Sequence, residues 1–383
     1  MKYFDYAATC PMDSEVLDTF VHASKEYFGN TSSLHDIGSK AHDLLTHCRQ
    51  SLADGLEVEQ EGIYFTSGGT ESNILAIQAL AQNGSSKRII TSAAEHSSIH
   101  NVLVKLEEEG FEVIKIPYTA EGIVNLEKLE DALKVPAALV TIQAINGEIG
   151  TAQPVNQIAA LCRKHGVYFH SDCVQAFGKG IDVALFDSFS LSSHKIYGPK
   201  GVGAVYIRPS ISFQSAMPHG THEGGVRPGT VNLPGVAGFT QAAANSLLHS
   251  EEHGEWIYSL KKHFIRAMEE SEEWIEWIGH PLQHQRSPIL GMCIKDIDGQ
   301  WMMLELNRKG FAVSTGTACQ AGQQEPSKTL LSMGYTRAAA QTFLRISFGK
   351  ETSIADVEAL ASQLKSLIRT RKGSPPYESA EVR

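Results

Sequence analysis

Short apolar runs alternate with amphipathic stretches over about residues 60–208. Seven of these runs are rich in β-branched and aromatic side chains and predict buried strands, at 62–66, 87–92, 112–117, 137–142, 167–172, 187–193 and 201–207. Helical periodicity lies between them, for example at 71–82 and 154–166. Because strands that alternate with helices form parallel sheets, this region predicts an α/β domain with a mainly parallel seven-stranded sheet.

The pattern changes after Thr230, where a helical region runs to about residue 272. It is followed by strand and helix patterns typical of a smaller α+β domain, at 288–295, 299–310, 311–314, 343–349 and 352–370. We expect a large domain at 16–260 and a small domain formed by 1–15 and 261–383. The N-terminal segment is therefore expected to return to the small domain or to the cleft.

Small, polar or titratable residues follow five of the predicted strands. The segments are "FTSGGTESN", "SAAEHSS", "QAINGEIGT", "HSDCVQ" and "SSHK". Ligands of open α/β sheets bind beyond the carboxyl ends of the strands, which in a parallel sheet share one edge. The sequence therefore predicts the functional site at this edge.

Three of these segments suggest a chemistry. Gly68 and Gly69 precede Thr70 at a helix start, which is either a phosphate cradle or an ordinary N-cap. Asp172 ends a buried strand, where it either pairs with a protonated ring nitrogen or caps a helix. Lys195 follows a strand and is a candidate for a Schiff-base lysine, with Lys200 in the next turn as the competitor.

Composition excludes several classes of protein. The net charge of −10 does not favour binding to nucleic acid, and no apolar run approaches the length of a membrane span. The N-terminus lacks the apolar block of a signal peptide. The six cysteines show neither a C-x-x-C pair nor a spacing typical of zinc ligands, so we expect no metal site and a cytoplasmic protein.

A phosphate cradle, a buried acid and a strand-end lysine together form the equipment of a pyridoxal 5'-phosphate (PLP) site. The chain resembles the NifS/IscS-type cysteine desulfurases of the class V PLP enzymes. The resemblance rests on "DYAATCPM", "FGNTSSLHDIG", "FTSGGTESNILAI", "AEHSSI", "NGEIGTAQP", "HSDCVQAFGK", "SSHKIYGPKGVGA", "HEGGVRPGT", "VSTGTACQAGQQEPS" and "FLRISFG". It implies the PLP-dependent transferase fold type I and a homodimer. The "CQAGQQEPSKTLL" form is similar to a Bacillus-type branch associated with NAD biosynthesis.

The resemblance also implies residue roles. Lys195 would attach to PLP and carry protons, His96 would stack on its ring, and Asp172 would pair with the ring nitrogen. Gln175 and Asn146 would also contact the cofactor, with Gln175 on the ring hydroxyl. The phosphate would be held by Gly69, Thr70, Ser192 and His194, and by Thr230 from the partner subunit. Arg345 and Asn30 would bind the substrate carboxylate, a task suited to the planar fork of arginine.

Cys319 is the expected nucleophile. Its segment, "STGTACQAGQQEPS", is small, polar and rich in glycine, which is typical of a mobile tether rather than of a core. The resemblance implies that L-cysteine yields L-alanine and a persulfide on Cys319. The sulfur would then pass to an acceptor protein, which is an iron–sulfur scaffold, a tRNA- or cofactor-thiolation enzyme, or an NAD-pathway enzyme that needs a cluster.

Two positions depart from the family pattern, and other functions stay open. Gly147 stands where a second asparagine is usual, and Gly224 stands where "HERG" has arginine. A class V aminotransferase would need no loop cysteine, whereas a selenocysteine lyase could share every feature. A non-catalytic scaffold or sulfur carrier would not need Lys195, His96 and Asp172 together.

Overall fold

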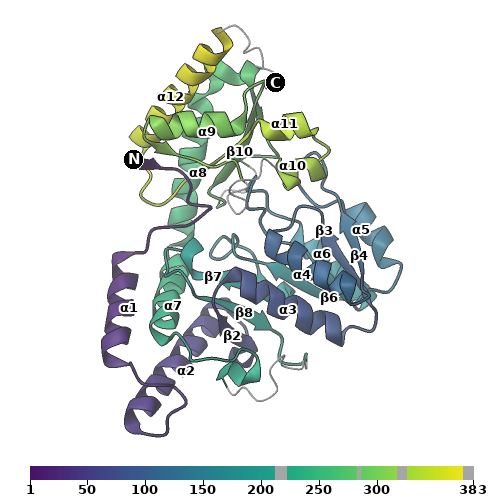
Figure 1. The fold of residues 1–383 in the computed structure, drawn as a ribbon, viewed down its shortest axis with the longest axis vertical. Coiled ribbons are helices and arrows are strands. Elements are labelled where there is room, and N and C mark those ends of the chain that lie inside the picture. Colours follow the sequence, from purple (N-terminus) through teal and green to yellow (C-terminus); the bar gives the residue numbers. More distant parts are fainter. Residues whose placement is uncertain (212–221, 283–285, 317–325, 374–383) are drawn as a thin grey trace, which may run out of the picture.

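The computed structural model describes residues 1–211, 222–282, 286–316 and 326–373. Cys319 and the tail beyond residue 373 lie outside these ranges. The central sheet occupies the lower half of the molecule in Figure 1, and a smaller sheet lies in the upper half. Helix α8 (Ser250–Ala267) runs along both halves.

The central sheet has seven strands in the order β2-β8-β7-β6-β5-β3-β4. Six strands are parallel to one another, and β8 runs antiparallel between β2 and β7. All seven coincide with predicted runs: β2 Ile63–Thr66, β3 Arg88–Ser92, β4 Glu112–Ile116, β5 Leu139–Thr141, β6 Tyr168–Asp172, β7 Ser188–Ser192 and β8 Gly203–Ile207. The α/β prediction is confirmed, because these strands are the continuous apolar segments that a sheet covered on both faces requires.

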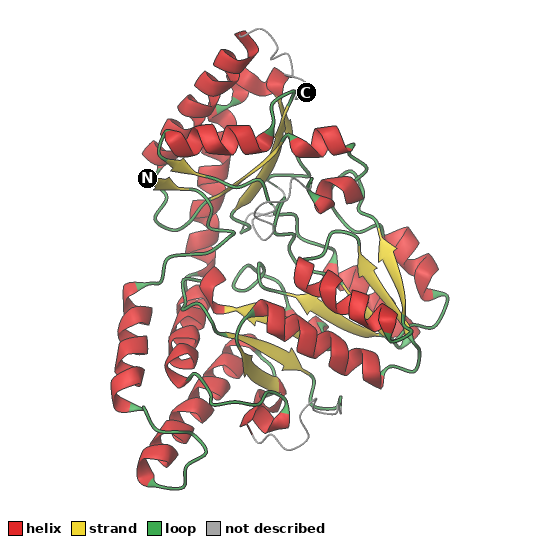
Figure 2. Ribbon diagram, in the orientation of Figure 1, coloured by secondary structure: helices red, strands yellow, loops and turns green. Residues whose placement is uncertain are grey.

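Helices cover this sheet, as Figure 2 shows in red over yellow strands. Helix α3 (Gly69–Asn83) packs on β7 and β8, and α4 (Ser97–Glu108) packs beside α3. Helices α1 (Ser14–Glu26) and α2 (Asp36–Leu56) pack on α7 (Leu233–Leu248). The remaining helices of this half are α5 (Leu126–Leu133) and α6 (Val155–His165).

The upper half contains an antiparallel sheet of β9 (Ile275–Trp277), β10 (Ile289–Ile294) and β12 (Phe343–Ser347). Strand β1 (Lys2–Tyr3) pairs in parallel with β11 (Phe311–Ala312), so the expected return of the N-terminus is confirmed. Four helices complete this half: α9 Gly299–Arg308, α10 Lys328–Ser332, α11 Arg337–Gln341 and α12 Ile354–Gly373. Short β9 was not predicted, because three residues are too few to show a periodicity.

The topology places the predicted functional segments together. Strands β2, β3, β5, β6 and β7 run in one direction, so the segments that follow them meet at one edge of the sheet. That edge faces the upper half in Figure 1. The domain border at 260/261 stays a prediction and falls inside α8. No helix among the described residues is long and apolar enough to cross a membrane.

Candidate active site

The start of α3 forms a cradle that only glycine permits. Gly68 has φ +147°, a conformation that side-chain-bearing residues rarely adopt. A Cβ on Gly69 would lie 2.6 Å from Val174 Cγ2 and 3.7 Å from Ser192 Cβ. The first backbone N–H groups of this 15-residue helix have no partners within the helix, and exposed Thr70 lies in its first turn beside them. Together with Ser192, these groups suit a phosphate.

Asp172 is fixed by two donors at the end of β6. Its side chain is buried, and Oδ2 accepts a 2.8 Å hydrogen bond from Asn73 Nδ2. Oδ1 accepts a 2.9 Å bond from the backbone N–H of Val174. Bonds donated to a carboxylate stabilise its charged form, so this arrangement can hold a negative charge opposite a cationic ligand group.

A chain of hydrogen bonds connects Asp172 with His96. Asn73 Nδ2 donates to Ser98 Oγ at 2.9 Å, and Ser98 Oγ lies 2.8 Å from His96 Nδ1. His96 caps α4, where its Nδ1 also accepts from the Ser98 backbone N–H at 3.2 Å. Sequence reasoning did not identify Asn73, although it lies one turn after Thr70 on the same helix.

Lys195 is held by the N-terminal segment. It lies in the short 3-10 helix Ser193–Lys195, and its Nζ donates to the carbonyl oxygens of Ala7 at 2.6 Å and Ala8 at 2.8 Å. Gln175 Nε2 donates to the same Ala7 oxygen at 2.9 Å. Lys200, in contrast, is exposed in the following turn. The geometry therefore favours Lys195 over Lys200 as the functional lysine.

His194 lies beside this lysine and is electrically neutral at pH 7. Its Nδ1 lies 3.1 Å from Thr9 Oγ1. Burial, together with the nearby charges of Lys195 and Lys200, lowers the pKa of His194 to about 4. A neutral imidazole can donate one hydrogen bond to an anion without adding a charge.

Arg345 is oriented from two sides on β12. Its Nη2 forms an ion pair with Asp5 Oδ1 at 2.8 Å, and Nη1 donates to the carbonyl oxygen of Gly147 at 2.8 Å. The guanidinium is buried, and its Nε has no hydrogen-bond partner among the described residues. A buried donor without a partner is costly, so a bound acceptor such as a carboxylate fits this position.

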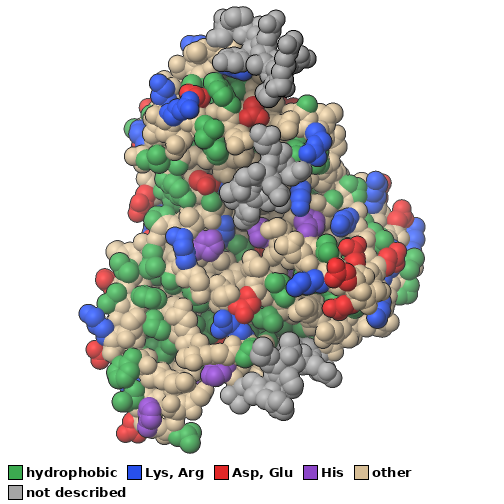
Figure 3. All heavy atoms as spheres, in the orientation of Figure 1, with side chains coloured by type: hydrophobic (Ala, Val, Ile, Leu, Met, Phe, Trp, Pro, Cys, Tyr) green, Lys and Arg blue, Asp and Glu red, His purple; other side chains and the backbone are tan. Residues whose placement is uncertain are grey.

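These groups come from both halves of the molecule: Arg345 lies on β12 of the upper half, and the others follow strands of the central sheet. Figure 3 shows histidine side chains (purple) with lysine and arginine (blue) along the boundary between the upper and lower halves. The set comprises an anion cradle, a carboxylate held at Asp172, a lysine amine and a buried guanidinium. Such a set can hold a phosphate-bearing cofactor and an amino-acid carboxylate at the same time.

Residues 2–360 match the family described as aminotransferase class-V. The chain belongs to this family. It is 40% identical over 381 residues to a NifS protein of Bacillus subtilis (strain 168), an alignment that covers 97% of this chain and 96% of the relative. It is 34% identical over 386 residues to the cysteine desulfurase IscS of Methanosarcina thermophila, covering 100% of this chain and 95% of the relative.

The likeness extends to the fold. A solved structure of a NifS-like protein superposes with a TM-score of 0.88 at 29% identity and covers 96% of this chain and 99% of its own. The resemblance read from the sequence motifs to NifS/IscS-type proteins of class V is therefore confirmed. The fold class expected from that resemblance is confirmed as well.

The side-chain amide of Asn146 is hydrogen-bonded to other residues of the chain through both its nitrogen and its oxygen. Its Nδ2 donates to Thr329 Oγ1 at 3.1 Å, and its Oδ1 accepts from the backbone N–H groups of Glu148 at 2.9 Å and Ile149 at 3.0 Å. These bonds fix the loop after β5 and connect it with α10. The predicted cofactor contact of Asn146 stays a prediction.

Two predicted residues are exposed within one chain. Thr230 is exposed after the segment 222–229. Asn30 is exposed between α1 and α2, and its Oδ1 accepts from the Ser32 backbone N–H at 2.9 Å. The connection between α1 and α2 lies at the lower end of the molecule, whereas β10 and its neighbour β12, which carries Arg345, lie in the upper half (Figure 1). Within the chain, Asn30 and Arg345 therefore do not meet.

Glu95 is a buried acid that sequence reasoning did not single out. Its carboxyl group accepts from Ser92 Oγ at 2.5 Å and from the backbone N–H of Gln143 at 3.1 and 3.0 Å. Burial raises the pKa of Glu95 to about 8, and the negative charge of Asp172 contributes. An acid directly before His96, after an apolar strand, was the available signal.

Proposed function

We propose that this protein is a PLP-dependent cysteine desulfurase that converts L-cysteine to L-alanine and leaves a persulfide on Cys319. The observation that carries the proposal is the Lys195 amine, held by two carbonyl oxygens at the same sheet edge as Asp172. The names of the relatives support the reaction and the substrate.

The residues present fit PLP. The glycine cradle, Thr70, Ser192 and neutral His194 would hold its phosphate, and Asp172 would face its ring nitrogen. Gln175, held by its contact with Ala7, would bind the ring hydroxyl, and His96, held by its contact with Ser98, would stack on the ring. When bound, PLP supplies an electron sink for the negative charge that develops on the substrate.

The chain's own groups do the remaining work. Arg345 binds the substrate carboxylate through donors that Asp5 and Gly147 orient. Lys195, once its amine is free, would take the proton from the substrate Cα. After the carbon–sulfur bond breaks, alanine needs one proton at Cβ, which completes the methyl group, and one at Cα. Lys195 would return its proton, and the proton released from the Cys319 thiol supplies the second. An ion pair at 4 Å is worth about 4 kcal/mol at an effective dielectric of ~20, so Asp172 is able to keep a ring nitrogen protonated at pH 7.

Cys319 is the proposed nucleophile. Its thiolate attacks the substrate sulfur, the carbon–sulfur bond breaks, and the sulfur stays on Cys319 as a persulfide. The five described cysteines are buried and free, and burial raises the pKa of each thiol: Cys10, Cys48, Cys162, Cys173 and Cys293. They are therefore poor nucleophiles at pH 7, which supports Cys319 by contrast. We propose cytoplasmic acceptors in iron–sulfur cluster assembly or in thiolation.

The first prediction tests these assignments. Lys195→Ala should abolish the colour of the lysine-bound cofactor and all production of alanine, whereas Lys200→Ala should retain both. Cys319→Ala should retain the colour and lose sulfur transfer to an acceptor. Absorbance, alanine assay and persulfide labelling measure the three results. Full activity in Lys195→Ala, or keto acid in place of alanine from the unaltered protein, contradicts the proposal.

We also propose that the protein acts as a homodimer. Large apolar side chains are exposed on α1, on the connection to α2 and in the first turn of α2: Leu17 at 48%, Val21 at 39%, Phe28 at 71%, Leu34 at 100% and Ile37 at 47%. Figure 3 shows apolar side chains (green) over this lower-left region. A second copy of the chain would cover this surface and bring its own Thr230 and Asn30 to the site.

A further inference from the structure

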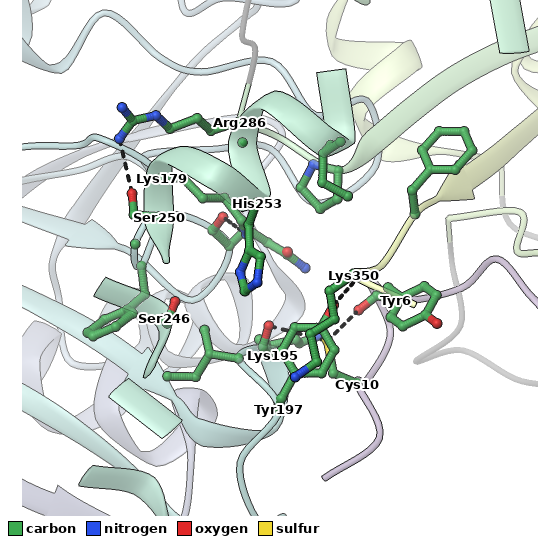
Figure 4. Close-up of a pocket in the computed structure, with 18 residues that line it drawn as sticks. Tyr6, Cys10, Lys179, Lys195, Tyr197, Ser246, Ser250, His253, Arg286 and Lys350 are labelled. Carbon is green, nitrogen blue, oxygen red and sulfur yellow. Dashed lines mark hydrogen bonds between the residues drawn. The ribbon is translucent and has the colours of Figure 1, made fainter. Parts of the chain in front are cut away.

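A cavity of about 80 Å³ lies between α8 and the turns that follow β6 and β7. Figure 4 shows the side chains around it, which come from both halves of the molecule. A water molecule needs about 10–15 Å³ of such space, so the cavity has room for a small ligand on the order of five heavy atoms. The proposed reaction gives no role to the side chains at the end of the cavity that faces α8.

The cavity is lined by positive charges. Its lysines and arginine are Lys179, Lys195, Arg286 and Lys350, and no carboxylate is among its described lining residues. Lys350 forms an ion pair with Asp13 at 2.5 Å, and Lys195 has the role described above. The charges of Lys179 and Arg286 are therefore the ones that the cavity leaves to be balanced.

Lys179 lies on the turn after β6 and retains capacity to donate hydrogen bonds. Among the described residues, its Nζ has a single hydrogen-bond partner, the neutral carbonyl oxygen of Gln175 at 2.6 Å. An ammonium group has three donors, so two remain for a ligand. Burial lowers the pKa of Lys179 to about 8, which still leaves the amine mostly charged at pH 7.

Arg286 brings a second positive charge to the same turn. Its Nη1 donates to Ser250 Oγ of α8 at 3.1 Å, a contact drawn as a dashed line in Figure 4. A Cβ added to Gly180, the neighbour of Lys179, would lie 3.2 Å from the same nitrogen. The ion pair of Arg286 with Glu251 is 3.5 Å long and the Glu251 side chain is 87% exposed, so this pair contributes little.

Hydroxyl groups complete this cluster of donors. A Cβ on Gly178 would lie 2.5 Å from Ser246 Oγ, so that hydroxyl lies directly against the turn just before Lys179. Gly178 and Gly180 have φ values of +68° and +78°, which glycine adopts readily, and their lack of side chains leaves room for these donors. An ammonium, a guanidinium and hydroxyl groups are all able to donate to one anion.

We propose that this cavity binds a small tetrahedral oxyanion, sulfate or phosphate, between Lys179 and Arg286. Two positive charges match a divalent anion, and the planar guanidinium is able to bind two of its oxygens. Lys179 belongs to the central-sheet half, whereas Arg286 precedes β10 of the upper half. The bound anion therefore connects the two halves and stabilises the folded protein.

This inference does not depend on the proposed function, and its test measures stability and not sulfur transfer. Thermal unfolding of the full-length protein is followed with increasing sodium sulfate or sodium phosphate, while sodium chloride keeps the ionic strength constant. The glycine cradle before α3 is a second position for an anion, so each titration is repeated with saturating PLP. Stabilisation that persists with PLP belongs to the cavity.

We expect the two oxyanions to raise the Tm of the unaltered protein in a saturable manner. Lys179→Met should weaken the apparent affinity at least about tenfold, because a charge-assisted hydrogen bond is removed. Lys179→Arg retains the charge and should retain most of the effect. Lys200→Met removes an exposed lysine that does not line the cavity, so this matched control should respond like the unaltered protein.

A second variant and a structure test the site independently of how Lys179→Met folds. Arg286→Met should also weaken the affinity at least about tenfold. Crystals grown with selenate, which resembles sulfate, should show the anomalous signal of selenium between Lys179 Nζ and the Arg286 guanidinium.

Stabilisation no greater than that given by sodium chloride, or full stabilisation in both variants, would overturn the proposal even if the protein proves to be an active desulfurase. Conversely, a response that both variants lose, in a protein without desulfurase activity, would support the anion site and refute only the proposed reaction.

Discussion

Two glycines at the site are under opposite constraints. A Cβ at Gly69 would lie 2.6 Å from Val174 Cγ2, so a side chain there requires Val174 or the helix start to shift. At Gly147, where relatives of this type usually have asparagine, an added Cβ would lie 3.7 Å from Gln175 Cγ and Nε2, an ordinary contact distance. Gly147 is therefore a position with room for the usual side chain.

We predict that Gly147→Asn folds normally and changes the affinity for PLP by less than about tenfold, because one neutral hydrogen bond contributes about 1 kcal/mol net. Fluorescence titration with PLP measures the affinity. Gly69→Ala is the contrasting variant and should weaken PLP binding more strongly, since the added methyl group displaces Val174 or the start of α3. A gain in turnover of tenfold or more in Gly147→Asn would show that the missing amide has a larger role.

The buried carboxyl group of Glu95 makes stability depend on pH. Its folded-state pKa of about 8 lies above that of an unfolded glutamate, so between about pH 4.5 and 8 the folded protein retains a proton that the unfolded chain releases. Stability from this group is therefore present at low pH and is lost as the pH rises through this window. The Glu95→Gln variant has no carboxyl group that titrates there, so its unfolding free energy should not show this decrease with rising pH.

Urea unfolding at pH 5, 6, 7 and 8 tests this prediction. The difference in unfolding free energy between the unaltered protein and Glu95→Gln should decrease steadily with rising pH. Comparing the two proteins cancels contributions from other titrating groups. Parallel curves for the two proteins across this range would mean that Glu95 is already ionised when folded.

At the scale of elements, the local pattern of apolar and polar residues was enough to predict the strands of the central sheet and the edge where the polar segments meet. Each apolar run of the central sheet became a strand, and the polar segments after β2, β3, β5, β6 and β7 met at one edge because parallel pairing requires it. The contacts between distant segments were not predictable. The contacts of Lys195 with Ala7 and Ala8 join residues that are 188 and 187 positions apart in the sequence, and no local periodicity predicts such a pair.

The segment His222–Gly225 is fixed by another distant pair. Glu223 has φ +47° and a side chain that is 1% exposed, and it binds Arg49 of α2 through two hydrogen bonds of 2.9 and 2.7 Å. It also accepts from the Phe65 backbone N–H at 2.6 Å. These contacts of Glu223 hold the segment that leads to Thr230. The neighbouring Gly224, where the family usually has arginine, is exposed and has no side chain to contribute.

We predict that Arg49→Met lowers the unfolding free energy by about 3 to 5 kcal/mol, because a buried carboxylate loses its charged partner. Chemical denaturation measures the change. Lys134→Met, which removes one partner of an ion pair that is 70% exposed on both sides, is the control and should have no measurable effect. Equal stability of the two variants would show that Glu223 is not held by charge.

At the scale of the whole molecule, the proposed dimer would account for two features of the single chain. Apolar side chains of α1 and of the segment that leads into α2 are exposed, Thr230 is exposed, and the α1–α2 connection with Asn30 lies far from the strand that carries Arg345. In the proposed symmetric dimer, the rotation that buries one copy's apolar patch would also bring the other copy's exposed residues across the interface.

The last prediction tests the oligomeric state by light scattering after gel filtration. The unaltered protein should be a dimer, and the double substitution Phe28→Glu with Leu34→Glu should shift it to monomer. Burying each such side chain contributes about 1.5 to 3 kcal/mol, so the dissociation constant should rise at least tenfold, roughly. Val104→Glu, at a position that is 50% exposed on α4, is the matched control and should stay dimeric.

Mixed dimers then test whether the sites are shared. Thr230→Glu should disable the site to which Thr230 contributes by repelling the cofactor phosphate, and Lys195→Ala disables its own site. If Thr230 serves the partner's lysine, unfolding and refolding the two inactive proteins together restores one intact site in each mixed dimer. Random reassortment then recovers about a quarter of the normal activity, because half of the dimers are mixed and each has one working site of two. If each chain instead uses its own Thr230, both sites of a mixed dimer are disabled, one by Lys195→Ala and the other by Thr230→Glu. No activity then returns.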